Sequence, residues 1–309
     1  GAVGTAARAL HNRPFSDWEF FLPDPCTIAE SFDRIAANYD RYAALQQEAG
    51  RRLLDRVEFR RLEPARILDL GCGSGSTAAA LKKTFRKARV LGLDLSPGML
   101  AEARRKSTLT RPFRLLCADM ARMPLAARSV DLVFANLSVL WVAQPEKLFA
   151  EVRRVLRPDG MFLFSGFGQG CLRQLSATWP ALDERVQLPI FPDLLETGDA
   201  LTAAGFREPV MDADRITLHY PALESLMGEL EATGTAQLVR GWQHWRENLD
   251  ALEQVWQPLR VEGRYPLSYE IVYGAAFGPA EGQPFRTPEG DVATFSVDSL
   301  LKSHRMVYS

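Results

Sequence analysis

The stretch Ile67-Leu68-Asp69-Leu70-Gly71-Cys72-Gly73-Ser74-Gly75 joins a short aliphatic run to a glycine-rich turn. The run from Ala65 to Leu70 predicts a buried β-strand, and the turn predicts the start of a helix that reaches about Phe85. A turn whose glycines lack side chains lets a ligand approach the backbone closely and permits positive φ. Taken alone, the segment is also open to a purely structural interpretation.

Strands and helices alternate on the C-terminal side of this turn. The predicted strands are 89–95, 113–117, 130–136 and 161–165, and the predicted helices are 97–106 and 145–156. Ser96 can cap the first of these helices, because Pro97 takes its first position. Strands separated by helices of this length predict a doubly wound α/β fold with a mostly parallel sheet covered on both faces.

Outside this core the pattern changes several times. We predict an N-terminal extension over 1–29, amphipathic helices covering a pocket over 30–64, and the core over 65–220. The segment 221–257 is rich in leucine and tryptophan at helical spacing and predicts a helical lid, with simple core packing as its alternative. A strand returning at the sheet edge, antiparallel to its neighbour, is expected within 258–278, whereas the tail 279–309 is not placed.

Composition excludes several classes of protein. The formal net charge is −1, without the basic excess typical of nucleic-acid binding. No apolar stretch approaches the roughly 18 residues that cross a bilayer, so no membrane span is expected. The cysteines lack the spacing of a metal site or a disulfide framework; they are Cys26, Cys72, Cys117 and Cys171. A cytoplasmic enzyme without a metal is therefore predicted.

Acidic residues follow three successive predicted strands. Asp69 lies beside the glycine turn, whose G-x-G-x-G spacing differs from the dinucleotide fingerprint, and a carboxylate there favours an ammonium group over a pyrophosphate. Asp94 can accept hydrogen bonds from two ribose hydroxyls, and Asp119 can accept one from an adenine amine while Met120 packs on the ring. Each acid alone could be a solvated loop residue, but together they predict an adenosyl ligand.

The segments ILDLGCGSG, GLDLSPGML, CADM and RPDG, within 65–165, resemble the class I methyltransferase family. The resemblance implies a Rossmann-like sheet of seven strands, one of them antiparallel, with S-adenosylmethionine as cofactor. The glycines would line its methionine part, Asp94 would hold the ribose, and Asp119 with Met120 would face the adenine. The cofactor-binding residues implied are Asp69, Gly71, Cys72, Gly73, Gly75, Asp94, Leu95, Met99, Asp119, Met120 and Asn136.

A narrower resemblance covers most of 31–274. The stretches SFDRIAANYD at 31–40, NLSVLW at 136–141, DER at 183–185 and GRYPLSY at 263–269 resemble the malonyl-acyl-carrier-protein O-methyltransferases of biotin synthesis. The resemblance implies methylation of the free carboxylate of a malonyl group on acyl carrier protein. Such a carboxylate is already ionised at neutral pH, so the site needs positioning and water exclusion rather than a strong base.

The catalytic candidates implied are Tyr39, Asn136, Arg185 and Arg264. One arginine would select the carboxylate, because a guanidinium fork meets both oxygens, although a surface ion pair is the alternative for each. Tyr39 would hydrogen-bond the cofactor carboxylate or the substrate, or else simply pack its helix. Asn136 would flank the methyl group together with Trp141, which is equally suited to the core.

An acidic carrier protein would dock on a local basic surface. The candidates are Arg104 to Lys106 with Arg111 and Arg114, or Arg51 and Arg52 with Arg60 and Arg61. Two other functions stay open. The first is a methyltransferase for a small free acid or a quinone. The second is an assembly factor that keeps the cofactor fold without transferring a methyl group.

Overall fold

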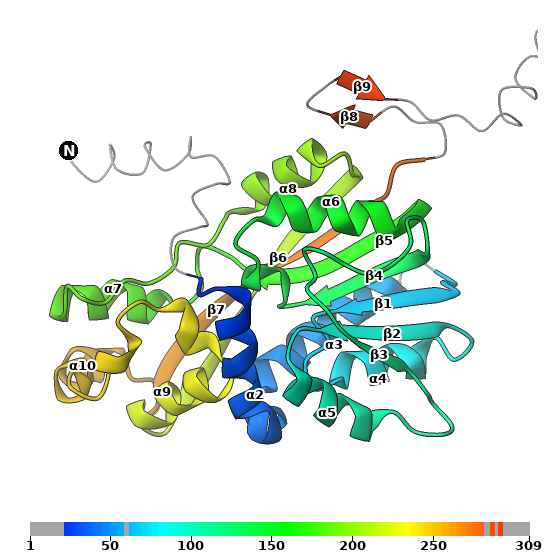
Figure 1. The fold of residues 1–309 in the computed structure, drawn as a ribbon. Helices are drawn as coiled ribbons and strands as arrows, with labels where there is room; N and C mark the ends of the chain where they lie inside the picture. The colour runs from blue at the N-terminus through cyan, green and yellow to red at the C-terminus, as the bar shows by residue number, and fades with distance from the viewer. Residues whose placement is uncertain (1–21, 59–61, 281–284, 288–289, 293–309) are drawn as a thin grey trace, which may run out of the picture.

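The computed structural model describes residues 22–58, 62–280, 285–287 and 290–292 (Figure 1). A seven-stranded sheet in the order β3-β2-β1-β4-β5-β7-β6 forms its centre. Its strands are β1 Arg66–Leu70, β2 Arg89–Asp94, β3 Arg114–Cys117, β4 Val130–Asn136, β5 Leu156–Phe167, β6 Arg207–Tyr220 and β7 Tyr265–Phe277. A separate two-stranded sheet joins β8 Phe285–Thr287 to β9 Gly290–Val292, within the tail that the sequence left unplaced.

The predicted doubly wound, mostly parallel sheet is confirmed. Strands β1 to β5 pair in parallel, and β7 pairs antiparallel with both β5 and β6. The predicted edge position of the returning strand is wrong, because β7 lies between β5 and β6, and β6 is the edge strand. The physical reason lies in its burial: β7 is buried at most of its positions and exposed at none, as an internal strand requires.

Helices cover both faces of the sheet. The α-helices are α2 Pro25–Tyr42, α3 Ala44–Glu58, α4 Ser76–Thr84, α5 Pro97–Lys106, α6 Pro145–Val155, α7 Arg173–Leu182, α8 Leu194–Ala203, α9 Leu223–Ala232 and α10 Leu249–Trp256. Figure 1 shows α6 and α8 on one face and α3, α4 and α5 on the other. Neighbouring residues of one strand therefore pack on opposite faces of the sheet. Ile67 packs with residues of α3 and α4, and Leu68 packs with residues of α6.

The composition of RPDG at 157–160 predicts a turn, but in the structure these residues lie within β5. The pairing of β4 with β5 passes from Val130 opposite Leu156 to Leu132 opposite Met161, so these residues form an irregular bulge.

None of the helices in the described part of the chain is long and apolar enough to cross a membrane.

The segment 221–257 packs against α2 and α7, and its helix α9 also contacts β6 and β7. It contains α9, α10 and the 3₁₀ turns η3 Thr235–Leu238 and η4 Trp242–His244. Trp256 is fully buried, and its indole donates a hydrogen bond to Thr178 Oγ1 at 2.8 Å. Gly234 lies against the ring of Phe32, so this segment supports α2 from behind.

Candidate active site

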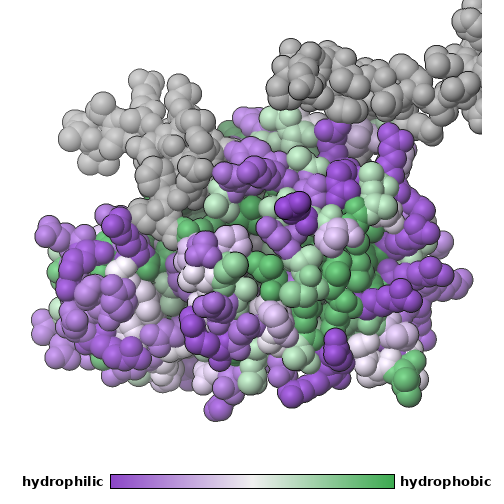
Figure 2. Space-filling model, viewed as in Figure 1, coloured by the Kyte–Doolittle hydropathy of each residue, from purple (hydrophilic) through white to green (hydrophobic). Residues whose placement is uncertain are grey.

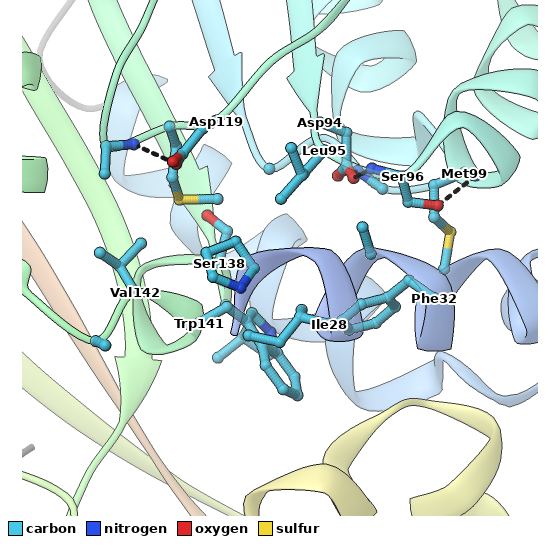
Figure 3. A pocket seen from close by; sticks show the side chains of 18 of the residues that line it. Ile28, Phe32, Asp94, Leu95, Ser96, Met99, Asp119, Ser138, Trp141 and Val142 are labelled. Carbon is cyan, nitrogen blue, oxygen red and sulfur yellow. Dashed lines mark hydrogen bonds between the residues drawn. The ribbon is translucent and has the colours of Figure 1, made fainter. Parts of the chain in front are cut away.

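A cavity of about 520 Å³ opens between the carboxyl ends of the parallel strands and α2. Figure 3 shows Asp94 and Asp119 on its strand side, with Ile28, Phe32 and Trp141 facing them from below. In Figure 2 hydrophobic residues gather in the middle of the view, flanked by hydrophilic ones. The cavity is thus a mainly apolar space with carboxylates at the strand tips, the usual form of a small-molecule site.

The glycine turn brings backbone to the cavity wall. Gly71 and Gly73 both line the cavity, with φ values of 69° and 52°. A side-chain carbon at Gly71 would lie 2.3 Å from Ser138 Cβ, whereas one at Gly73 would meet nothing within 4 Å. Gly71 is therefore required by close packing, and Gly73 leaves open space for a ligand.

Asp94 ends β2 with both carboxylate oxygens held in place. Oδ2 accepts from the backbone N–H of Gly73 at 2.8 Å, and Oδ1 accepts from that of Ser96 at 2.9 Å. Each oxygen keeps a further lone pair on the cavity side, because a carboxylate has about four acceptor positions. Burial raises the pKa of Asp94, with the two N–H donors opposing that effect.

Asp69 is a buried carboxylate without compensation. Its side chain is 1% exposed, and neither oxygen has a hydrogen-bond partner among the described residues. Burial first, and the neighbouring Asp94 charge second, raise the pKa of Asp69 well above its usual range. A cation next to this group would relieve an otherwise unfavourable arrangement.

The other implied cofactor residues divide into two groups. Those that line the cavity are Leu95, Met99, Asp119, Met120 and Asn136. Asp119 accepts from the backbone N–H of Ala121 at 2.8 Å, which fixes its carboxylate at the cavity rim. Asp69, Cys72 and Gly75 do not line the cavity: Asp69 is buried behind the wall, the Cys72 thiol lies against Gly92, and Gly75 packs against Ala103 of α5.

Tyr39 reaches the cavity from α2. Its ring lies 6.4 Å from that of Phe32, seven residues earlier on the same side of the helix. Burial, followed by the nearby charges of Asp94 and Asp40, raises the pKa of Tyr39 well above its usual range. The hydroxyl is therefore a neutral hydrogen-bond donor at any physiological pH.

Asn136 is fixed at the end of β4 by two partners. Its amide nitrogen donates to the carbonyl oxygen of Gln46 at 2.8 Å, and its amide oxygen accepts from Ser165 Oγ at 2.8 Å. Trp141 also lines the cavity and packs edge-on against Phe32 at 5.0 Å. Both residues are oriented before any ligand binds.

The two candidate arginines lie away from the cavity. Arg185 donates to Asp183 at 2.7 Å and to Glu247 at 3.0 Å, so its charge is already compensated. Arg264 is exposed and precedes β7, whose residue Ile271 pairs with the last residue of β5, Phe167. At about 3.3 Å per residue, Arg264 lies about 23 Å beyond that strand end.

Sequence reasoning missed several wall residues: Ile28, Phe32, Ser96, Ser138, Val142 and Lys147. Ser138 donates to the carbonyl oxygen of Leu70 at 2.6 Å and so joins β1 to the segment after β4. The helical spacing of Ile28, Phe32 and Tyr39 was the available signal, since residues four and seven apart share one helix face.

The sheet order, the glycine turn after β1 and the acids at the ends of β2 and β3 define a class I S-adenosylmethionine-dependent methyltransferase. Residues 68–164 match the family model described as a methyltransferase domain. The chain is 39% identical over 274 residues to the malonyl-[acyl-carrier protein] O-methyltransferase of Laribacter hongkongensis, covering 85% of this chain and 92% of that protein. The chain belongs to the malonyl-[acyl-carrier protein] O-methyltransferase family.

Other comparisons agree. The protein of the same name from Methylovorus sp. is 36% identical over 268 residues, covering 84% of this chain and 90% of that protein. Among solved structures, phosphoethanolamine N-methyltransferase 2 of Haemonchus contortus matches with a TM-score of 0.52 and 18% identity, covering 82% of this chain and 60% of that one. At this identity the structural match supports the fold alone.

Proposed function

We propose that this protein transfers a methyl group from S-adenosylmethionine to the free carboxylate of a malonyl thioester on acyl carrier protein, an early step of biotin synthesis. The observation that carries the proposal is the family relationship, which extends over 85% of this chain and 92% of a relative with that name. The cavity provides a site whose carboxylates suit the cofactor.

The residues present fit S-adenosylmethionine. Asp94 would accept hydrogen bonds from the ribose hydroxyls, Asp119 and Met120 would face the adenine, and Gly73 leaves space for the methionine part. Asp69 lies behind the cavity wall, so its carboxylate favours an ammonium group of the ligand through charge and without lining the cavity. When bound, the cofactor supplies a sulfonium-activated methyl group.

The chain's own residues act by positioning the acceptor. A malonyl carboxylate is ionised at neutral pH, so no residue has to remove a proton. Tyr39 and Asn136 both line the cavity, where the neutral phenol can donate a hydrogen bond to one carboxylate oxygen. Phe32 and Trp141 exclude water, which would otherwise solvate the nucleophile.

This assignment does not require an arginine at the reacting carboxylate. Arg185 is engaged by two acids, and Arg264 lies beyond the strand ends. Their role in selecting the carboxylate stays a prediction, tested by measuring KM for the acceptor after Arg185→Ala and Arg264→Ala.

The structure limits the choice of a surface for carrier protein. Arg51 and Arg52 are paired with acids of α3 and β6, and Arg60 and Arg61 lie outside the described residues. Arg114 begins β3 and therefore lies at the sheet end opposite the cavity, whereas Lys106 of the same basic run contacts Ser74 of the glycine turn. The docking role of either basic run stays a prediction, as does a cytoplasmic location, where thiols remain reduced.

The direct test is methyl transfer from labelled S-adenosylmethionine to malonyl-carrier protein, malonyl-coenzyme A or free malonate. We expect base-labile label on the carrier-bound substrate, in preference to free malonate. Equal labelling of free malonate would instead support a methyltransferase for small acids. Cofactor binding without any transfer would support an assembly factor.

Tyr39→Phe should lower kcat/KM for the malonyl acceptor about tenfold, the effect of losing one hydrogen bond to a charged group. Because the pKa of the phenol is raised, the wild-type rate should not follow ionisation of Tyr39 between about pH 7 and 9. Tyr42→Phe is the matched control, since Tyr42 lies on the same helix but not on the cavity wall. Equal rates for the two variants would contradict the assigned role.

Asp69→Asn should stabilise the ligand-free protein at neutral pH. With a raised pKa, the folded state binds more protons than the unfolded state, so stability falls as pH rises above the ordinary carboxyl value of about 4. The gain, about 1–3 kcal/mol for relieving a buried uncompensated group, should disappear at about pH 4. Thermal melts at both pH values test this expectation. An equal gain at both would disprove the electrostatic cause.

A further inference from the structure

Helix α2 carries two carboxylates that lie on one side of the helix. Asp33 and Asp40 are seven residues apart, about two helical turns, and so project in nearly the same direction. Phe32 and Tyr39 form the adjacent stripe, which lines the cavity. One stripe of α2 therefore faces the cofactor space while the next meets the loops that surround it.

Asp33 contacts the loop that follows β2. Its Oδ1 accepts from Ser96 Oγ at 2.5 Å and from the backbone N–H of Gly98 at 2.7 Å. The backbone N–H of the same Ser96 donates to Asp94 Oδ1 at 2.9 Å. One residue thus joins α2 to the carboxylate at the tip of β2.

Asp40 contacts the glycine turn after β1. Its Oδ1 accepts from Ser74 Oγ at 2.5 Å, and its Oδ2 forms an ion pair with Lys106 Nζ at 2.5 Å. Lys106 also donates to Ser74 Oγ at 3.0 Å. The residue before Ser74 is Gly73, whose N–H donates to Asp94 Oδ2 at 2.8 Å.

Both connections therefore converge on Asp94 from opposite sides. We propose that Asp33 and Asp40 are positioning residues that clamp α2 over the cavity and hold the two cofactor loops in register around Asp94. The clamp rests on the cofactor part of the proposed function and is independent of the methyl acceptor. Closing of α2 and ordering of the cofactor loops become one event, because the same contacts produce both.

The contacts are exposed enough to open. The side chains of Asp40 and Lys106 are 45% and 27% exposed, so water can replace their interaction when α2 moves away. Exchange of cofactor for its demethylated product requires such an opening, because α2 forms one wall of the cavity. Because these ionic contacts are accessible to solvent, they can hold α2 over the cavity and still break when the ligand leaves.

The test measures binding of S-adenosylhomocysteine by calorimetry and hydrogen exchange of residues 25–42 in the full chain. Asp33→Ala and Asp40→Ala should each raise Kd about tenfold, since each removes charge-assisted hydrogen bonds that are partly solvated. Both should also speed exchange of α2 in the bound protein. Asn38→Ala, an exposed position on the same helix, is the control and should change neither quantity.

Two further variants guard against simple misfolding. Asp33→Asn keeps an acceptor oxygen and should recover most of the affinity, to within about threefold of wild type. Lys106→Met breaks the Asp40 ion pair without altering α2. Unchanged Kd in the folded variants would overturn the clamp. Weaker binding without faster exchange of α2 would also overturn it, because the effect would then belong to the loops alone.

Neither outcome depends on the acceptor, so the result is distinct from the methyl-transfer test. In steady-state assays the variants should raise KM for S-adenosylmethionine and leave kcat nearly unchanged. That division is expected when residues hold the cofactor loops without touching the reacting atoms.

Discussion

Asp94→Ala should weaken binding of S-adenosylhomocysteine about 100-fold while leaving the melting temperature nearly unchanged. The carboxylate offers two acceptors to a ribose diol, and hydrogen bonds to charged groups are worth about 1.5–3 kcal/mol each, so a loss of about 3 kcal/mol is a modest expectation. The ligand-free fold loses little, because burial and the charge of Asp33 raise the pKa of Asp94 and already oppose its ionisation. Calorimetry and thermal melts on the same samples give both quantities.

Two comparisons isolate the cause. Asp94→Asn should not restore affinity, because its amide nitrogen would face the N–H of either Gly73 or Ser96, donor against donor. Asp131→Ala provides the opposite control: Asp131 accepts from the backbone N–H of Arg66 at 2.8 Å, at the far end of the sheet. It should lower the melting temperature and leave affinity unchanged. Binding by Asp94→Ala within about threefold of wild type would contradict the site.

The core strands were predictable because local pattern and tertiary environment agree. The predicted strand 130–136 matches β4, and Ser96 caps α5 by accepting from the N–H of Met99 at 3.0 Å. These elements are buried or capped by neighbours in sequence, so their signal is local.

Strand β6 was only partly predictable for the opposite reason. The sequence predicts a strand only at about 215–220, whereas β6 begins at Arg207. Its early part has half-buried and exposed residues, which include Asp212 and Asp214. These acids are paired with Arg56 and Arg52 of α3, a contact between segments more than 150 residues apart. No local pattern reveals such compensation, so the stretch looks too polar for a strand.

The candidate site likewise has a part that local sequence patterns predict and a part that depends on contacts between distant segments. Asp94, Asp119 and Gly73 lie on one cavity because the carboxyl ends of parallel strands meet at one edge, which strand assignment alone implies. The roles of Asp33 and Asp40 were not visible, since a helix face acquires meaning only from the surface on which it docks. The pairing of Arg185 with Glu247 was not visible either, because Glu247 lies in a distant segment; only its other partner, Asp183, is two residues away.

Gly71→Ala should abolish cofactor binding and destabilise the protein. An L-residue at a φ of 69° costs about 1–2 kcal/mol. The added carbon would also lie 2.3 Å from Ser138 Cβ, and such overpacking costs about 1–3 kcal/mol more. The turn or the segment after β4 must move, and both line the cavity. Denaturant unfolding gives the stability loss, and calorimetry with S-adenosylhomocysteine gives the binding loss.

Gly73→Ala separates backbone strain from steric clash, because Gly73 also has positive φ but its added carbon would meet nothing within 4 Å. It should lose only about 1–2 kcal/mol of stability. If the clash with Ser138 is the cause, adding Ser138→Gly to Gly71→Ala should restore part of the lost stability. The double variant should then be more stable than the sum of the two single effects predicts. Equal destabilisation by the two alanines, without any recovery in the double variant, would assign the whole effect to backbone conformation. The tight contact between the turn after β1 and the segment after β4 would then not be what shapes the cofactor wall.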